Sequence, residues 1–70
     1  MPSVQFKKSE VKRLLTGKAV FVEDVLEASE LKKEDIFAGF SGEDFIGIYK
    51  VTNEEKKFAR PEFVMQPMGQ

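Results

Sequence analysis

The apolar residues of this chain lie in short segments that end at glycines or at charged residues, and this spacing restricts the possible folds more than any other feature. Five segments are rich in valine, isoleucine and phenylalanine, and none is longer than nine residues. That length and content are typical of β-strands. The expected strands are residues 4–6, 19–22, 35–40, 45–51 and 57–65. We therefore expect a mainly β fold.

One helical pattern stands between the first two expected strands. Ser9 is a candidate N-cap there, and Gly17 is a candidate C-terminal stop. Three apolar residues between them share one helix face, at positions i, i+3 and i+4: Val11, Leu14 and Leu15. The pattern predicts a short amphipathic helix, with Lys12 and Arg13 on the face away from the apolar stripe.

The apolar residues of segment 23–35 follow neither a helical nor a strand period. Val25, Leu26 and Leu31 are the large apolar residues there, among six acids. We interpret this segment as an irregular crossing with room for one helical turn, whose leucines cover an open end of the core. Five short strands with one helix commonly close into a small barrel, which removes exposed sheet edges.

Glycine and proline inside two expected strands need an explanation. Gly47 weakens a strand unless a corner, a bulge or a closely approaching backbone requires it, and a barrel corner is the favoured interpretation. The alternative makes Gly39 and Gly47 the floor of a groove for a nucleic-acid backbone. Pro61 cannot donate to a ladder, so it predicts an edge or a bulge.

The chain has seven phenylalanines and one tyrosine, a large aromatic share for its 70 residues. Exposed aromatic rings can stack on unpaired bases. Phe37 and Tyr49 are ambiguous, because their neighbours in the strand already supply an apolar face. The other strand phenylalanines stand at alternating positions, and we assign these five to the core: Phe6, Phe40, Phe45, Phe58 and Phe63.

The composition excludes most catalytic and metal chemistry. The chain has no cysteine and no histidine, so the commonest metal ligands and general base are missing. Two acid pairs, residues 34–35 and 43–44, have no apolar setting that would raise a pKa for general acid catalysis. No phosphate-binding glycine motif is present. Neither a membrane helix nor a signal peptide is indicated, so we expect a cytoplasmic protein without a cofactor.

Charge is unevenly distributed, although the net charge is only −1. Residues 1–22 carry five basic groups and one acid, a local charge of +4, whereas residues 23–44 carry eight acids and two lysines, a local charge of −6. The pattern predicts one cationic side and one anionic side.

Three phrases in this order resemble the C-terminal, PUA-like domain of bacterial tRNA pseudouridine synthase B, the TruB family. They are PSVQFKKSEVKRLLTGK, KKEDIFAGF, and GEDFIGIYKV followed by ARPEFVM. The resemblance covers residues 2–65, and Glu34 stands where many PUA domains have glycine. It implies a small PUA-like barrel over residues 1–66, followed by a flexible tail, residues 67–70.

The resemblance also implies a function. In that family the parent enzyme isomerises a T-loop uridine of tRNA to pseudouridine with an aspartate of a large N-terminal catalytic domain, so we expect no catalytic residue here. The C-terminal domain helps to hold tRNA through phosphate and sugar contacts, which lysine and arginine provide. The expected partners are tRNA and the catalytic domain, and the expected state is a monomer. The candidate RNA-binding residues are Lys7, Lys8, Lys12, Arg13, Lys18, Lys50 and Arg60.

Two alternatives belong to other classes. A small barrel can dock another protein or domain through its acidic side or through an exposed strand edge, without contacting RNA. A free-standing enzyme requires a titratable pair in an apolar pocket, and the sequence offers no such pair.

Overall fold

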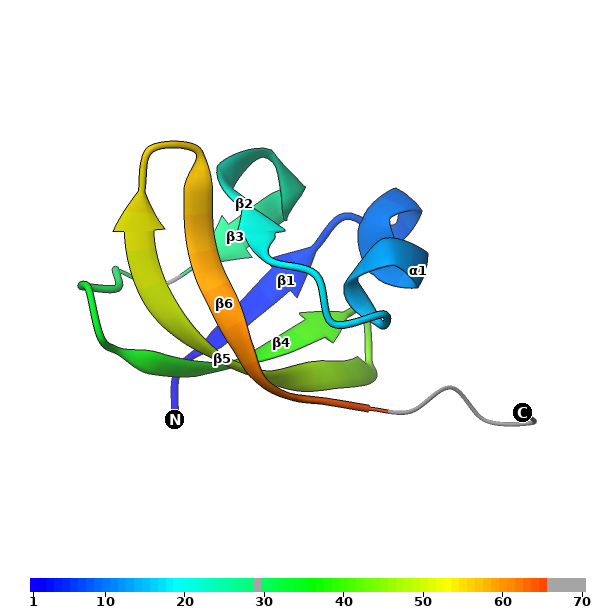
Figure 1. Ribbon diagram of the computed structural model, residues 1–70. Helices are drawn as coiled ribbons and strands as arrows, with labels where there is room; N and C mark the ends of the chain where they lie inside the picture. The colour runs from blue at the N-terminus through cyan, green and yellow to red at the C-terminus, as the bar shows by residue number, and fades with distance from the viewer. Residues whose placement is uncertain (29, 66–70) are drawn as a thin grey trace.

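The computed structural model describes residues 1–28 and 30–65, and it confirms a mainly β fold with one short α-helix (Figure 1). The predicted tail, residues 67–70, lies outside the described residues. The elements are β1 (Ser3–Phe6), η1 (Lys8–Glu10), α1 (Val11–Leu14), β2 (Val20–Phe21), η2 (Val22–Asp24), β3 (Val25–Ala28), β4 (Ile36–Ser41), β5 (Asp44–Glu54) and β6 (Lys57–Val64).

The strands form one sheet in the order β2-β6-β5-β4-β1-β3. Strands β1 and β4 are parallel, and the other neighbours are antiparallel. The two end strands, β2 and β3, are consecutive in the chain and are joined by the three residues of η2. The sheet must therefore curl until its two ends are close together, and the ribbon shows this curl (Figure 1). The result is an incomplete barrel.

Side chains on the concave face of the sheet form the core. Two of them, Phe37 and Tyr49, were ambiguous from the sequence and lie at its centre, with their rings stacked at 5.4 Å between centroids. The Phe6 ring meets Tyr49 edge-on at 5.4 Å, and Phe58 lies 5.6 Å from Phe37. The fully buried apolar residues are Val4, Phe6, Leu14, Val20, Phe37, Ile46, Tyr49, Val51 and Ala59.

The core assignment of the phenylalanines was right for Phe6 and, in part, for Phe58, which is partly buried against the core. It was wrong for Phe63, whose side chain is 54% exposed on the convex face. The reason is a bulge, because β6 pairs Pro61 with Tyr49 but Phe63 with Ile48, so one extra residue reverses the alternation. Phe40 and Phe45 are half-buried, and they also lie outside the core cluster.

The crossing was predicted only in part. Its helical turn is η2, and Leu31 packs against the core as expected. Residues Val25–Ala28 form a sixth strand that the sequence did not indicate, because it has only four residues, three of which pair with β1, and a bulge interrupts the pairing. The expectation for Leu26 was wrong, since its side chain is 65% exposed.

Gly47 is required by a close approach of backbone. A Cβ at this position would overlap the carbonyl oxygen of Phe63 and lie 3.1 Å from Cα of Val64. A Cβ on Gly39 would meet the ring of Phe6. The groove interpretation was therefore wrong, because the protein's own atoms fill both spaces. Pro61 stands at the bulge, as predicted.

Candidate nucleic-acid interface

Four exposed lysines surround the first helix. Lys7 follows β1, Lys8 begins η1, Lys12 lies in α1, and Lys18 follows the turn at Gly17. The helix does not begin with the predicted cap, because Ser9 lies inside the 3₁₀ turn η1 and makes no capping hydrogen bond. Leu14, in α1, is fully buried, and Val11 and Leu15 pack against the core, so the apolar stripe was predicted correctly.

Arg13 differs from the four lysines. We expected it to face away from the core, but its side chain is only 31% exposed and it turns towards η2. Its guanidinium donates hydrogen bonds to the carboxylates of Glu10 and Asp24 and to the carbonyl oxygen of Ala19. The guanidinium carbon also lies 5.1 Å from the centroid of the Phe21 ring. Arg13 therefore attaches α1 to β2 and η2.

Asp24 is the buried member of this network, with only 2% of its surface exposed. One carboxylate oxygen accepts hydrogen bonds from Arg13 and from the backbone N–H of Phe21. Its backbone carbonyl accepts a bond of 2.8 Å from the N–H of Lys7. Asp24 thus fixes the end of β1, the helix and β2 relative to one another. Partial burial alone would lower the pKa of Arg13, but hydrogen bonds to Asp24 and Glu10 and their negative charges raise it overall.

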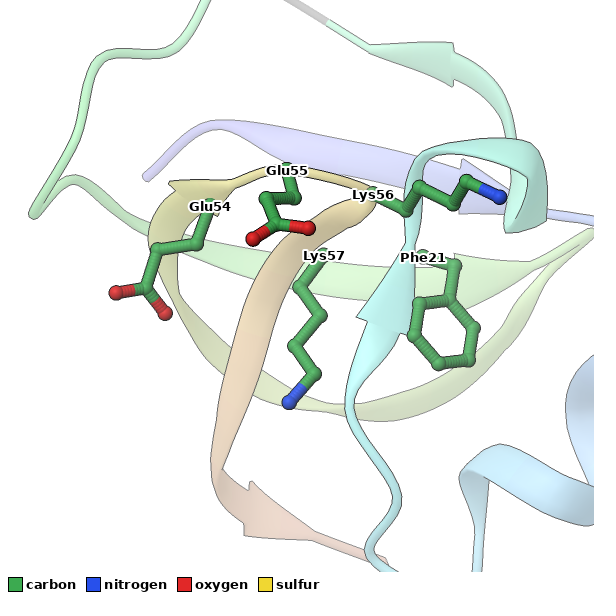
Figure 2. A pocket seen from close by; sticks show the side chains of 5 residues that line it. All are labelled: Phe21, Glu54, Glu55, Lys56 and Lys57. Carbon is green, nitrogen blue, oxygen red and sulfur yellow. The ribbon is translucent and has the colours of Figure 1, made fainter.

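A groove adjoins this network. Figure 2 shows five of its side chains, and the groove has a volume of about 420 Å³. Phe21 and Lys57 are cross-strand partners, and their side chains extend in the same direction (Figure 2). The N–H of Val22 donates to the carbonyl of Lys56, which holds the β5–β6 turn beside η2. The lining residues are Phe21, Glu54, Glu55, Lys56 and Lys57.

Sequence reasoning missed Phe21, Lys56 and Lys57. Phe21 and Lys57 were read as parts of two different strands, and Lys56 stood between the expected polar turn and the last strand. Only the pairing of β2 with β6, 36 residues further along the chain at Phe21 and Lys57, brings them together. We call the set Lys7, Lys8, Lys12, Lys18, Phe21, Lys56 and Lys57 the basic surface.

The structure does not bring Lys50 and Arg60 next to the lysines of the helix. They are cross-strand partners on β5 and β6, and Lys50 also pairs with Ile36 at the start of β4. The helix follows the end of β1, which is aligned with the far end of β4 near Phe40. The seven predicted RNA-binding residues therefore form two groups at opposite ends of β4, and their role stays a prediction.

The described residues, 1–28 and 30–65, contain no group of three or more acidic side chains that could hold a metal ion. None of the helices in that part of the chain is long and apolar enough to cross a membrane. Burial raises the pKa of Tyr49 to about 12, while the positive charge of Arg13 acts in the opposite direction. Its hydroxyl is buried without a hydrogen-bond partner. The ring belongs to the core and does not line the groove of Figure 2.

Two solved structures share this architecture. One is an H/ACA ribonucleoprotein bound to a substrate RNA containing 2'-deoxyuridine, with a TM-score of 0.81 and 20% identity over 99% of this chain. The other is a conserved PUA domain protein from Thermoplasma acidophilum, with a TM-score of 0.76 and 17% identity over 97% of this chain. The chain spans 25% and 50% of the length of those two chains. A scan against protein-family models and a search of curated proteins gave no match.

The likeness defines a fold class. The chain has a small PUA-like fold, as the resemblance of its three sequence phrases implied. At these levels of identity, the likeness to solved structures establishes the fold and leaves the ligand to be argued from the surface.

Proposed function

We propose that this chain is an accessory RNA-binding domain that holds RNA through the basic surface. The observation that carries the proposal is the arrangement of exposed lysines on the helix and on the β5–β6 turn: the buried Asp24–Arg13 pair joins the helix to η2, and the hydrogen bond from the Val22 N–H to the Lys56 carbonyl joins the turn to η2. Lysines provide phosphate contacts, which position RNA without reading its sequence. The Phe21 ring adds an apolar surface beside them, where a base or a ribose can pack.

The more specific proposal is that the RNA is tRNA and that the parent enzyme is a tRNA pseudouridine synthase of the TruB type. It is supported by the order of the three phrases and by the fold that this chain shares with part of an H/ACA ribonucleoprotein structure. In this proposal the catalytic aspartate belongs to another domain, and the present domain acts as a monomer that binds the acceptor-stem side of the tRNA.

A titration of the ¹⁵N-labelled chain with tRNA at low salt tests the proposal. Resonances of residues 7–18, Phe21 and Lys56–Lys57 are expected to shift, and added salt is expected to reverse the shifts, because binding releases counterions. Lys32 and Lys33 are exposed lysines outside the basic surface, and they provide the internal control. If no resonance of the basic surface moves at low salt, the RNA role of this surface is wrong.

One observation favours docking to a protein as a second candidate function. Strand β3 forms an end of the sheet and carries Leu26, which is 65% exposed, beside the exposed Glu27. An extended partner with basic residues fits such an edge. Substitution of Leu26 and Glu27 would then weaken partner binding and leave tRNA binding unchanged.

A further inference from the structure

Three phenylalanines form a continuous row on the convex face of the sheet. The rings of Phe40 and Phe45 meet edge to face at 5.6 Å between centroids, and the rings of Phe45 and Phe63 lie 6.5 Å apart at an interplanar angle of 20°. Phe45 thus supports the Phe63 ring from one side. Phe63 is the large apolar residue of β4, β5 and β6 that is more than half exposed, at 54%.

Two cations stand on the same face. Two sets of cross-strand neighbours run across β4, β5 and β6: Ala38, Ile48 and Phe63 form the first, and Ile36, Lys50 and Arg60 form the second. On β5 the two sets are separated by the two-residue step from Ile48 to Lys50, which corresponds to about 7 Å along a strand. The exposed ring and the two cations are therefore close enough to meet adjacent parts of one short ligand.

Each cation has a carboxylate neighbour, and one partner of each pair is largely exposed to solvent. Lys50, whose side chain is 30% exposed, lies 3.6 Å from Glu34, which is 70% exposed, and Arg60, which is 61% exposed, lies 3.3 Å from Glu62, which is 39% exposed. Ion pairs with a solvent-exposed partner contribute little to stability, so a phosphate can replace the carboxylate at small cost.

We propose that this convex face binds an unpaired segment of RNA, with one base stacked on Phe63 and the adjoining phosphates on Lys50 and Arg60. Aromatic rings beside cations are the usual elements of single-strand binding, because every base has a stacking face. Duplex RNA offers no exposed base face to the ring. The proposal rests on RNA binding as the general function, but it uses a surface separate from the basic surface.

A protein partner fits this face less well. A stable protein interface buries about 800 Å² on each partner, about one sixth of the 4934 Å² that this chain exposes. Phe40 and Phe45 are half-buried within the sheet surface, so Phe63 is the most exposed ring of the row, and Met65, which is 40% exposed, follows it two residues along the chain. A single exposed ring between charged residues suits one base better than a protein surface.

The test compares two fluorescent RNA probes, an unstructured oligouridine and a stable hairpin with a short loop, by anisotropy at low salt. Phe63→Ala is expected to weaken oligouridine binding by about 5- to 150-fold, the range that corresponds to the loss of one stacked base. Hairpin binding is expected to stay unchanged. Leu26→Ala is the matched control, because it removes an apolar side chain that is 65% exposed elsewhere on the sheet.

A second variant tests the cations. In Lys50→Gln/Arg60→Gln, the slope of log affinity against log salt for oligouridine is expected to fall in magnitude by about 1.4, because two single-strand phosphate contacts are lost. The proposal is overturned if both variants bind oligouridine like the parent chain, or if Phe63→Ala changes the oligomeric state in size-exclusion chromatography and not RNA affinity. If the hairpin still binds through the basic surface in that case, the proposed function survives. If the parent chain binds neither probe, both proposals fail.

Discussion

The guanidinium of Arg13 in α1 donates a hydrogen bond to the buried carboxylate of Asp24 in η2, 11 residues further along the chain. This contact joins the fold to the candidate site, because the same carboxylate fixes Phe21 and the carbonyl of Asp24 fixes Lys7. A chain with a thin core therefore uses one charged pair to hold several parts of its basic surface in place.

Replacing Asp24 with alanine is expected to lower the free energy of unfolding by about 2–3 kcal/mol, since it leaves Arg13 and the N–H of Phe21 without their partner. The loss is smaller than for a fully buried pair, because Arg13 is 31% exposed. Asp24→Asn keeps an oxygen acceptor for Phe21 and should lose less. Urea unfolding measures both variants, and equal losses would contradict the role given to the Phe21 hydrogen bond.

Tyr49 supports a prediction about pH. Its pKa is raised from 10.0 to about 12 by burial, so the unfolded chain loses this proton at lower pH than the folded chain. Stability from the neutral phenol is complete below pH 10 and is lost as the pH rises towards 12, by about 3 kcal/mol in total. Since the chain has one tyrosine and no tryptophan, ultraviolet absorbance follows this titration directly. A midpoint near 10 in the folded protein would contradict the prediction.

Tyr49→Phe provides the matching variant. The Tyr49 hydroxyl is buried without a partner, and its removal relieves an unfavourable desolvation. We expect this variant to be more stable than the parent chain at neutral pH by about 1 kcal/mol, and its stability between pH 10 and 12 to fall less steeply.

Gly47→Ala is expected to be one of the most destabilising small substitutions in the chain. The added Cβ would overlap the Phe63 carbonyl oxygen, so strand β6 has to move. Overpacking typically lowers the free energy of unfolding by about 1–3 kcal/mol. Because Gly47→Ala displaces backbone atoms, we expect its cost at the upper end of this range. Gly39→Ala is the comparison, because there the added atom meets the ring of Phe6. Thermal unfolding of both variants checks the order, and a larger loss for Gly39→Ala would contradict it.

The sequence predicted where the helix and strands lie better than it predicted which of their faces is buried. The helix stripe, the β4–β5 hairpin and the placement of Pro61 at an edge or a bulge follow from local patterns, and these predictions were confirmed. The exposure of Phe63 could not be predicted from the sequence, because one bulged residue reverses the alternation of buried and exposed side chains. The sequence of β6 alone does not show which residues of β5 lie opposite the bulge. β3 escaped prediction for a related reason, since a four-residue strand with a bulge has no readable alternation.

The sequence predicted only the part of the candidate site whose residues are close together in the chain. The lysines between Lys7 and Lys18 are close in sequence, so their cluster could be inferred. Lys56 and Lys57 join them through the pairing of β2 with β6, which is a long-range contact. The structural role of Arg13 likewise depends on Asp24, a residue that sequence analysis placed in an irregular crossing.

Glu34 stands at a position where glycine was expected from the PUA resemblance, and its backbone adopts φ 80°. The N–H of Glu34 donates to the carbonyl of Val51, so the surrounding ladder holds this strained conformation. Glycine accepts a positive φ without cost, although it loses more entropy on folding. Glu34→Gly is therefore expected to stabilise the chain by about 0.5–1 kcal/mol in urea unfolding, and Glu34→Ala to give no gain.

Charge reversal at the helix tests the basic surface most directly. Lys12→Glu/Lys18→Glu removes two proposed phosphate contacts and introduces repulsion, so tRNA affinity should fall. A neutral variant, Lys12→Gln/Lys18→Gln, should reduce the magnitude of the salt slope by about 1.8, at about 0.9 for each contact. Both lysines are exposed, so the fold should be unaffected. Lys32→Glu/Lys33→Glu changes the net charge equally at another part of the surface. If this control weakens tRNA binding as much as the helix variant does, the binding depends on net charge and the basic surface is not the site.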